Sequence, residues 1–218
     1  MTLAIFDLDN TLLAGDSDYE WGQFLVNKGI VDKDVYEQAN NRFLEQYQQG
    51  QLDIHEFAQF AFQPLAENSL EDLLSWREVF LQEVIAPLMT SKAKDLVKYH
   101  QQQEHTLLVI TATNSFITAP IVESFGIPHL IATEPKQRNG HYIAEIEGVP
   151  CFQEGKVERL KDWLIIHNKD LGGSIFYSDS HNDLPLLKMV ETAVAVDPDE
   201  KLKQVAEDLK WDIISLRD

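Results

Sequence analysis

Two carboxylates stand directly after the first apolar segment of the chain. Asp7 and Asp9 follow Leu3–Phe6, a run typical of a buried parallel strand. A lone Asp there would indicate only a turn, but the whole string Asp-Leu-Asp-Asn-Thr-Leu after an apolar strand indicates chemistry. In a continuing strand, Asp7 and Asp9 would lie on one face of the sheet. Both reach the crevice beyond the strand end only if the chain leaves the pleat there. We therefore predict a sharp turn at this strand end.

A second pair of carboxylates, Asp179 and Asp183, follows the apolar run Ser174–Tyr177. By itself this segment is a polar turn leading into a helix, but that reading does not explain why strand-end carboxylates occur twice. In open parallel sheets, the ligand crevice lies outside the carboxyl ends of the strands. The two pairs should therefore converge in space, although they are far apart in the sequence.

Two further polar residues occupy comparable places. Thr111 closes the apolar run Val109-Ile110, directly before Ala112, and Lys156 lies at the start of a predicted helix over 156–167. Alone, Thr111 would be an ordinary β-branched strand residue and Lys156 a surface lysine. They become candidate functional residues because the same edge of the sheet should bring the carboxylates close to them.

These side-chain types together suit phosphoryl transfer. A nucleophilic carboxylate can form an acyl phosphate and so divide one hard hydrolysis into two easier steps. A second carboxyl group can protonate the leaving oxygen and later deprotonate water. A lysine and a hydroxyl can bind the phosphoryl oxygens. A third carboxylate, together with the nucleophile, can hold Mg²⁺, which prefers oxygen ligands.

The elements that must position these residues alternate between strand and helix. That order predicts an α/β fold with a doubly wound parallel sheet. A helical stretch from about Asp18 to Val84, too long for a simple crossover, separates the first two strands. We read it as an inserted helical cap, so that residues 1–15 and 87–218 form the core and residues 16–86 form the cap. Asn139-Gly140 predicts a hairpin turn between two short strands.

Net charge and cysteine content limit the classes of partner. The 218 residues carry 18 Lys and Arg against 36 Asp and Glu, a formal charge of −18. That charge repels phosphate backbones and anionic lipids, so we expect neither nucleic acid nor a membrane as partner. The single cysteine, Cys151, excludes an intrachain disulfide and fits a reducing compartment. The first residues do not resemble a signal peptide, and we expect a cytoplasmic protein.

In order and spacing, the candidate residues resemble the four motifs of the haloacid dehalogenase superfamily. The resemblance spans essentially the whole chain and is greatest to the phosphoserine-phosphatase-like branch, whose helical cap also lies between the first two motifs. The motif residues are, in chain order, Asp7, Asp9, Thr11, Thr111, Lys156, Asp179 and Asp183.

The resemblance implies a role for each motif. Asp7 would be the nucleophile and Asp9 the general acid and base, while Lys156 would stabilise the phosphorylated Asp7. The metal ion implied is Mg²⁺, held by Asp7, Asp179 and the backbone carbonyl of Asp9.

The phosphate-binding and supporting positions also follow from the resemblance. Thr111, Ala112 and Lys156 would bind the phosphoryl group. Asn182 and Asp183 would lie behind the site and support it.

The cap departs from the phosphoserine phosphatases. Asp16 stands where they have an acidic residue, but Gln59 falls where an arginine that grips the substrate carboxylate is expected. Histidinol phosphate, the substrate of other members of the branch, has an amine and an imidazole and no carboxylate. It would suit a cap that carries acidic and aromatic residues, although helix packing is the better explanation for at least half of the aromatic ones. The acidic candidates are Asp16, Asp18 and Glu20, and the aromatic ones are Trp21, Phe57 and Phe60.

We therefore expect a Mg²⁺-dependent phosphatase for a small phosphorylated metabolite, with histidinol phosphate or a related amino-alcohol or amino-acid phosphate as substrate. One alternative is a phosphoserine phosphatase, if Arg42 or Arg77 reaches the pocket from a neighbouring helix. Another is a phosphotransferase that passes the phosphoryl group of Asp7 to an alcohol. A binding protein without activity is disfavoured because every charged catalytic position is filled. We expect a monomer or a homodimer.

Overall fold

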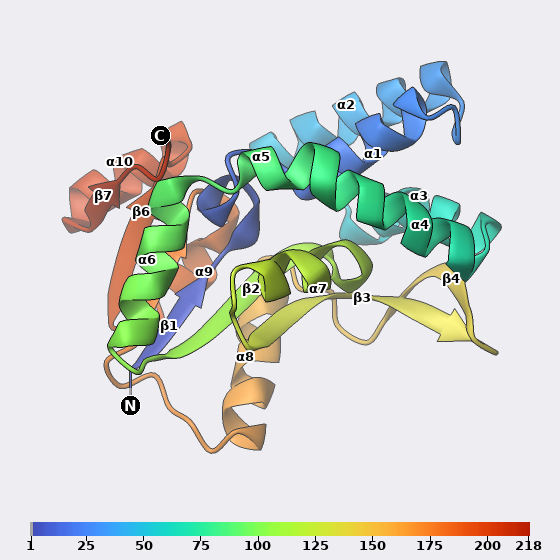
Figure 1. The fold of residues 1–218 in the computed structure, drawn as a ribbon. Coiled ribbons are helices and arrows are strands. Elements are labelled where there is room, and N and C mark those ends of the chain that lie inside the picture. Colours follow the sequence, from blue (N-terminus) through green and yellow to red (C-terminus); the bar gives the residue numbers. More distant parts are fainter. Residues whose placement is uncertain (1) are drawn as a thin grey trace.

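The computed structural model describes residues 2–218, which contain a seven-stranded sheet in the order β4-β3-β2-β1-β5-β6-β7 (Figure 1). The strands are β1 (Leu3–Phe6), β2 (Thr106–Asn114), β3 (His129–Arg138), β4 (His141–Glu147), β5 (Ile175–Ser178), β6 (Thr192–Val196) and β7 (Asp212–Ile214). Neighbouring strands are parallel apart from β3 and β4, which are antiparallel. The predicted α/β class and parallel sheet are confirmed.

Helices cover both faces of the sheet because alternate strand residues point to opposite sides. Ala4 and Phe6 of β1 belong to a core shared with α6 (Ser91–Gln102) and α7 (Ser115–Ser124). Leu3 and Ile5 belong to a second core on the other face. The helices of that second face are α8 (Glu154–Ile166), α9 (Leu184–Leu187) and α10 (Glu200–Leu209).

The helical stretch between β1 and α6 lies together at the end of the sheet toward which β1 points (Figure 1). It comprises α1 (Ser17–Asn27), α2 (Lys33–Gln49), α3 (Ile54–Glu67), α4 (Leu70–Phe80) and α5 (Ala86–Leu88), with a π-type turn over Leu81–Ile85 between the last two. Polar caps fix where these helices begin: the side chains of Asp53 and Ser69 accept backbone amides at the starts of α3 and α4. Gly50, with a φ of 73°, ends α2.

Strand β3 is longer than the two short strands expected from the sequence. Its first half pairs with β2, and its second half continues beyond β2 and pairs with β4. The turn between β3 and β4 is Asn139-Gly140, as predicted, and both residues have positive φ, 53° and 80°. Such a turn matches the twist of the flanking strands.

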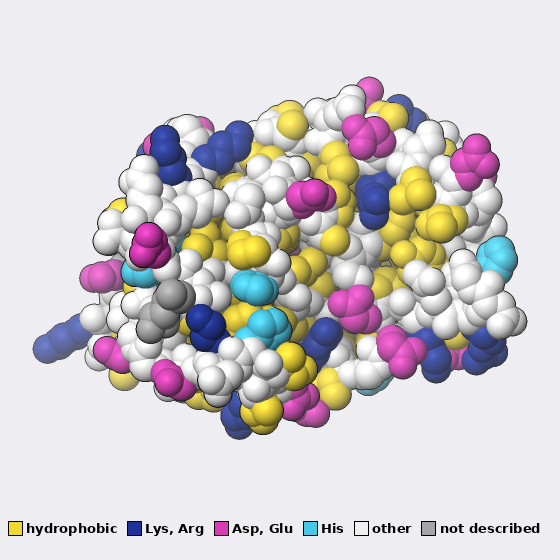
Figure 2. Space-filling view, turned by 60° about the horizontal axis from the view of Figure 1, so that its bottom comes forward, with side chains coloured by type: hydrophobic (Ala, Val, Ile, Leu, Met, Phe, Trp, Pro, Cys, Tyr) yellow, Lys and Arg dark blue, Asp and Glu magenta, His cyan; other side chains and the backbone are white. Residues whose placement is uncertain are grey.

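No helix among residues 2–218 is long and apolar enough to cross a membrane. On the face drawn in Figure 2, acidic side chains are scattered over the surface and do not gather in one patch. The net charge is therefore spread over this face.

Candidate active site

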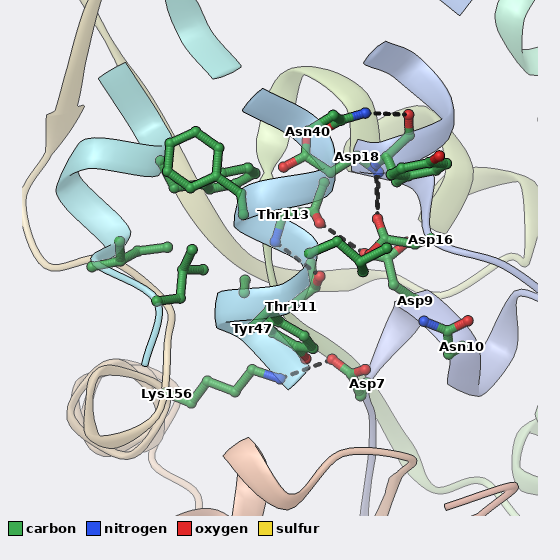
Figure 3. Close-up of a pocket in the computed structure, with 17 residues that line it drawn as sticks. Asp7, Asp9, Asn10, Asp16, Asp18, Asn40, Tyr47, Thr111, Thr113 and Lys156 are labelled. Atoms are coloured by element: carbon green, nitrogen blue, oxygen red, sulfur yellow. Dashed lines mark hydrogen bonds and ion pairs between the residues drawn. The ribbon is translucent and has the colours of Figure 1, made fainter. Parts of the chain in front are cut away.

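The chain leaves the pleat of β1 directly after Asp7. A tight π-type turn over Leu8–Leu12 follows, closed by a bond from the Leu13 amide to the Leu8 carbonyl at 2.9 Å. Within it, Asn10 takes a left-handed conformation with a φ of 56°, which Asn tolerates better than most residues. The turn brings Asp7 and Asp9 into the same pocket, as the sequence predicted (Figure 3).

Lys156 joins two carboxylates that are distant in the sequence. Its Nζ lies 2.8 Å from Asp7 Oδ1 and 2.7 Å from Asp183 Oδ1, and all three side chains are almost fully buried. Burial opposes the ammonium charge, but Asp183 and Asp7 outweigh it and raise the pKa of Lys156. Lys156 is therefore a charged group at neutral pH. Ser178 donates to Asp183 at 2.7 Å and fixes the far side of the cluster.

Asp9 is held by two donors, one to each carboxylate oxygen. Oδ1 accepts the Ser17 amide at the start of α1, at 2.7 Å, and Oδ2 accepts the Thr113 hydroxyl at 2.8 Å. Burial, reinforced by Asp16, raises the pKa of Asp9 to about 6. The side chain is thus fixed in orientation, and its affinity for a proton is greater than that of an ordinary aspartate.

The end of β2 forms the wall beside Asp9. Thr111 and Ala112 both line the pocket, and the Thr111 side-chain oxygen accepts the Thr113 amide at 3.2 Å. The sequence analysis identified Thr111 and Ala112 but missed the role of Thr113 as a partner of Asp9. The available signal was a second hydroxyl two residues after Thr111, on the same side of the strand.

Asp179 lies at the end of β5, outside the residues that line the pocket. Its Oδ1 accepts the Thr11 hydroxyl at 3.0 Å, and its amide donates to the same hydroxyl oxygen at 3.0 Å. Burial, then Asp7 and Asp183, raise the pKa of Asp179 well above its usual value. The structure therefore brings a third carboxylate into the electrostatic field of the Asp7 and Asp183 pair.

Among residues 2–218, no group of three His, Cys, Asp or Glu side chains is arranged to hold a metal ion. The predicted site differs from such a group because it has two carboxylates, Asp7 and Asp179, and the main-chain carbonyl of Asp9. All three are oxygen donors of the kind that Mg²⁺ takes. Among residues 2–218, the side chain of Asp179 accepts from the neutral hydroxyl of Thr11 and takes part in no ion pair.

Asn182 and Asp183 are buried and do not line the pocket, although Asp183 pairs with Lys156, which does. The Asn182 side chain accepts Gln153 Nε2 at 3.1 Å and donates to the backbone carbonyl of Tyr47 at 3.1 Å. Asn182 therefore connects α2 to the loop that precedes α8.

The pocket lies between the sheet end and the helices α1, α2 and α3. Its lining residues are Asp7, Asp9, Asn10, Asp16, Asp18, Tyr19, Asn40, Phe43, Leu44, Tyr47, Leu52, Ile54, Phe57, Thr111, Ala112, Thr113 and Lys156. Lys156 is the one basic side chain in this set. Sequence reasoning missed Tyr19, Asn40, Phe43 and Tyr47, because only the packing of the helices decides which of their faces meets the sheet.

Asp16 and Asp18 form the acidic side of the pocket (Figure 3). Asp16 also caps α1, since its Oδ1 accepts the amides of Asp18 and Tyr19 at 3.0 and 2.9 Å. Asp18 has a single distant partner, Asn114 Nδ2 at 3.5 Å. Burial, then Asp16 and Asp9, raise the pKa of Asp18 well above its usual value. Glu20, by contrast, does not line the pocket.

Of the aromatic residues expected to face a substrate, only Phe57 lines the pocket. Trp21 is 2% exposed and packs against Phe24 and Phe80 in the core, so its expected substrate contact is wrong. Phe60 packs on Tyr36 and on Phe43 within the helical layer. Trp21 and Phe60 lie on faces of α1 and α3 that pack against other helices, so neither side chain reaches the pocket.

Neither candidate arginine lines the pocket. Arg42 pairs with Glu56 at 2.9 Å near the surface, and Arg77 donates to the Phe116 carbonyl at 2.7 Å. Gln59, at the position where an arginine would be expected, is exposed. The described pocket therefore has no arginine, and its one basic side chain, Lys156, is already paired with Asp7 and Asp183.

Comparisons with known proteins agree on one family. The model of the haloacid dehalogenase-like hydrolases matches residues 4–188. A histidinol-phosphatase of Neisseria meningitidis serogroup C is 42% identical over 219 residues, covering 99% of both chains. The phosphoserine phosphatase SerB1 of Mycobacterium tuberculosis is 28% identical, covering 98% of this chain and 70% of the relative.

Solved structures show the same fold. A Bordetella pertussis protein of unknown function has a TM-score of 0.93 and 43% identity, with 99% of both chains covered. A substrate-bound phosphoserine phosphatase has a TM-score of 0.72 and 18% identity, with 99% of this chain and 92% of the other covered, a likeness of fold alone.

Proposed function

The chain belongs to the haloacid dehalogenase-like hydrolases and is a phosphoric monoester hydrolase, and we propose that its substrate is histidinol phosphate. The observation that carries this proposal is the pocket itself. Beyond the phosphate end it has an acidic side, Asp16 and Asp18, an aromatic residue, Phe57, and no arginine. Histidinol phosphate offers an amine and an imidazole to such a pocket and no carboxylate.

Electrostatics favour that substrate over phosphoserine. A carboxylate placed beside Asp16 and Asp18 would be desolvated without a cation, which costs several kcal/mol. An ammonium group in the same place gains from both aspartates. The 42% identity to a protein named histidinol-phosphatase supports the same choice.

We also propose that the reaction passes through a phosphorylated Asp7. A carboxylate oxygen of Asp7 attacks phosphorus, and the bond from phosphorus to the ester oxygen breaks. Asp9 gives its proton to that leaving oxygen. Asp9 then takes a proton from water, whose oxygen attacks the phosphorus, and the bond to Asp7 breaks to release inorganic phosphate.

In this proposal, Lys156 and the end of β2 stabilise the transferring group. Lys156 is fixed 2.8 Å from Asp7, so its positive charge faces the phosphoryl group once Asp7 attacks. Thr111 and Ala112 line the same wall and would bind phosphoryl oxygens. Asn182 and Asp183 hold the surroundings of Lys156 in place.

Mg²⁺ fits the oxygen donors at the sheet end, and we propose that Asp7, Asp179 and the Asp9 carbonyl hold it. When bound, the ion offsets the negative charge of the phosphoryl oxygens. EDTA should abolish phosphate release and added Mg²⁺ should restore it. Ca²⁺ should inhibit, because it accepts longer bonds and more ligands. Full activity in EDTA would contradict this part of the proposal.

Residues 16–86 would then act as a cap domain on a core of residues 1–15 and 87–218, contributing the acidic and aromatic lining. This division rests on the position of α1 to α5 over the sheet end (Figure 1).

Steady-state phosphate release tests the substrate. We expect kcat/KM for histidinol phosphate to exceed that for phosphoserine by at least about tenfold, roughly the 1.4 kcal/mol of one ion pair. Asp16→Asn should narrow the ratio, mainly by weakening the cationic substrate. Equal or better activity on phosphoserine would make the alternative, a phosphoserine phosphatase, the better reading. Phosphate release that rises only with an added alcohol acceptor would indicate a phosphotransferase.

A further inference from the structure

Tyr47, in the last turn of α2, brings an aromatic hydroxyl to the phosphate end of the pocket. Figure 3 shows its side chain pointing from α2 toward Asp7 and Lys156, apart from the acidic side formed by Asp16 and Asp18. Burial, then Asp179, Asp7 and Asp183, raise the pKa of the Tyr47 phenol well above its usual value. The hydroxyl is therefore a proton donor at neutral pH.

The Tyr47 hydroxyl has no hydrogen-bond partner among residues 2–218, although it lies beside several carboxylates and an ammonium group. Its neighbours are already engaged with one another. Lys156 uses two of its three protons on Asp7 and Asp183, and Thr11 donates to Asp179. The phenol is thus a donor left free for a group that enters the pocket.

A transferring phosphoryl group needs such donors. Its charged oxygens accept several hydrogen bonds. The surroundings are rich in acceptors and not in donors, because Asp7, Asp9 and Asp179 donate no hydrogen bond while they are ionised. Donors at the phosphate end of the pocket include the remaining proton of Lys156, the hydroxyl of Thr111 and the phenol of Tyr47. Of these, Tyr47 alone comes from the helical stretch between β1 and β2.

The last turn of α2 is bound to the core at its backbone. Asn182 Nδ2 donates to the Tyr47 carbonyl at 3.1 Å, and Asn182 is itself held by Gln153 at 3.1 Å. Lys201 of α10 donates to the carbonyls of the next two residues, Gln48 and Gln49, at 3.4 and 3.3 Å. The Tyr47 ring therefore projects from a turn that the core holds in place.

We propose that Tyr47 is a phosphoryl-binding residue, whose hydroxyl donates a hydrogen bond to a non-bridging oxygen of the transferring group, and that Asn182 positions it. This inference rests on the proposed phosphatase chemistry but not on the identity of the substrate. Because the phosphoryl group is common to all substrates, the contribution of Tyr47 should be the same for each of them.

Tyr47→Phe tests the proposal, since it removes the hydroxyl and keeps the ring. We expect kcat/KM to fall about tenfold or more, the scale of a hydrogen bond to a charged group, and by the same factor for histidinol phosphate and for p-nitrophenyl phosphate. Competitive inhibition by inorganic phosphate should weaken in parallel. Tyr99→Phe is the matched control, because Tyr99 is exposed on α6, far from the pocket, and should leave all three values unchanged.

Unchanged kinetics and unchanged phosphate inhibition in Tyr47→Phe would overturn the proposal. So would a loss confined to histidinol phosphate, which would assign the hydroxyl to the leaving group. Both outcomes leave wild-type phosphatase activity intact, so they are distinct from a failure of the proposed function, in which the wild-type enzyme itself does not release phosphate.

The positioning role of Asn182 has its own test. Asn182→Ala should lower kcat/KM with both substrates. In the double variant with Tyr47→Phe, kcat/KM should fall by less than the product of the two separate factors, because both changes weaken the same hydrogen bond from Tyr47 to the phosphoryl group. Fully multiplicative losses would contradict the coupling of Asn182 to Tyr47.

Discussion

At the scale of single residues, the site depends on how each carboxylate is partnered. Asp7 is paired with Lys156, Asp9 accepts two neutral donors, and Asp18 has one partner at 3.5 Å. Burial raises the pKa of Asp7 to about 7, while the Lys156 ammonium opposes that shift. The three environments suit three roles: a nucleophile beside a cation, an acid and base held in orientation, and a carboxyl group left for a cationic substrate.

Thr113→Val tests the orientation of Asp9. Valine keeps the shape of threonine but removes the hydroxyl that bonds Asp9 Oδ2 at 2.8 Å. We expect kcat to fall about tenfold, since one charge-assisted hydrogen bond contributes roughly 1.5–3 kcal/mol, part of which the second donor, Ser17, retains. The KM should change little.

Thr90→Val is the control for that prediction. Thr90 is also buried and its hydroxyl bonds the Leu216 carbonyl at 2.7 Å, away from the pocket. It should lower the melting temperature and leave kcat unchanged. If Thr113→Val behaved like Thr90→Val, Thr113 would have only a structural role.

Which residues the sequence could reveal depends on the element that carries them. Asp7, Thr111 and Asp179 stand at strand ends, and parallel strands bring their ends together, so sequence position alone predicts their meeting. Tyr47 and Trp21 lie on helices, where an aromatic side chain can face either a pocket or the core. Tyr47 faces the pocket and Trp21 faces the core. The packing of one helix on another decides between the two, and no local pattern encodes it.

At the scale of elements, the end of α2 contacts the loop that carries His181 and Asn182. Gly50 ends that helix with a φ of 73°, and a Cβ there would meet His181 Nε2 at 3.1 Å. Gly50→Ala should therefore strain the turn and also push α2 from the loop that carries Asn182. We expect a stability loss of about 1 kcal/mol together with a several-fold fall in kcat/KM.

Gly29→Ala separates the strain of the turn from the displacement of α2. Gly29 has a similar φ of 69°, but a Cβ there meets nothing within 4 Å. Its substitution should cost similar stability in a denaturant titration and leave kcat/KM unchanged. Equal kinetic losses in both variants would show that strain alone, and not the contact of α2 with the core, lowers activity.

At the scale of the whole molecule, a buried histidine joins α6 to the sheet. His100 is fully buried, with Nε2 2.9 Å from the Tyr177 hydroxyl and Nδ1 2.7 Å from His105 Nδ1. Burial, and then the proximity of His105, lower the pKa of His100 to about 4. The unfolded chain, with a His pKa near 6.5, binds a proton that the folded chain does not.

Stability should therefore fall as the pH drops from about 6.5 to about 4, because the unfolded state is favoured by proton binding in that window. The loss over this window is on the order of 3 kcal/mol, and none of it has occurred above pH 6.5. Denaturant titrations at several pH values across this range give the free energy of unfolding at each pH. That free energy should change less steeply with pH in His100→Gln than in the wild type. The slope for the exposed control, His55→Gln, should match the wild type. If His100→Gln showed the same pH dependence of unfolding free energy as the wild type, His100 would not be the source of that dependence.

The parallel sheet and the long run of helices after β1 were predictable from the alternation of elements, but the strand order was not predicted and the length of β3 was not predictable. Its second half pairs with β4 beyond the edge of β2, and the sequence there, Glu134-Pro135, carries a residue that usually ends strands. The predicted cytoplasmic location and the monomeric or homodimeric state stay predictions.

The central claim, that the enzyme transfers the phosphoryl group of histidinol phosphate to Asp7, can be measured directly. Excess enzyme with Mg²⁺ is mixed with histidinol phosphate, quenched in acid within one turnover, and its peptides are analysed by mass spectrometry. Asp9→Asn, which should slow the chemistry by about 10²–10⁴-fold, provides a form in which the acyl phosphate persists. We predict one phosphoryl group on the peptide that contains Asp7, absent in Asp7→Asn, which should also release no phosphate. Phosphate release without this adduct, an adduct at another residue, or activity of more than a few per cent in Asp7→Asn would contradict the account.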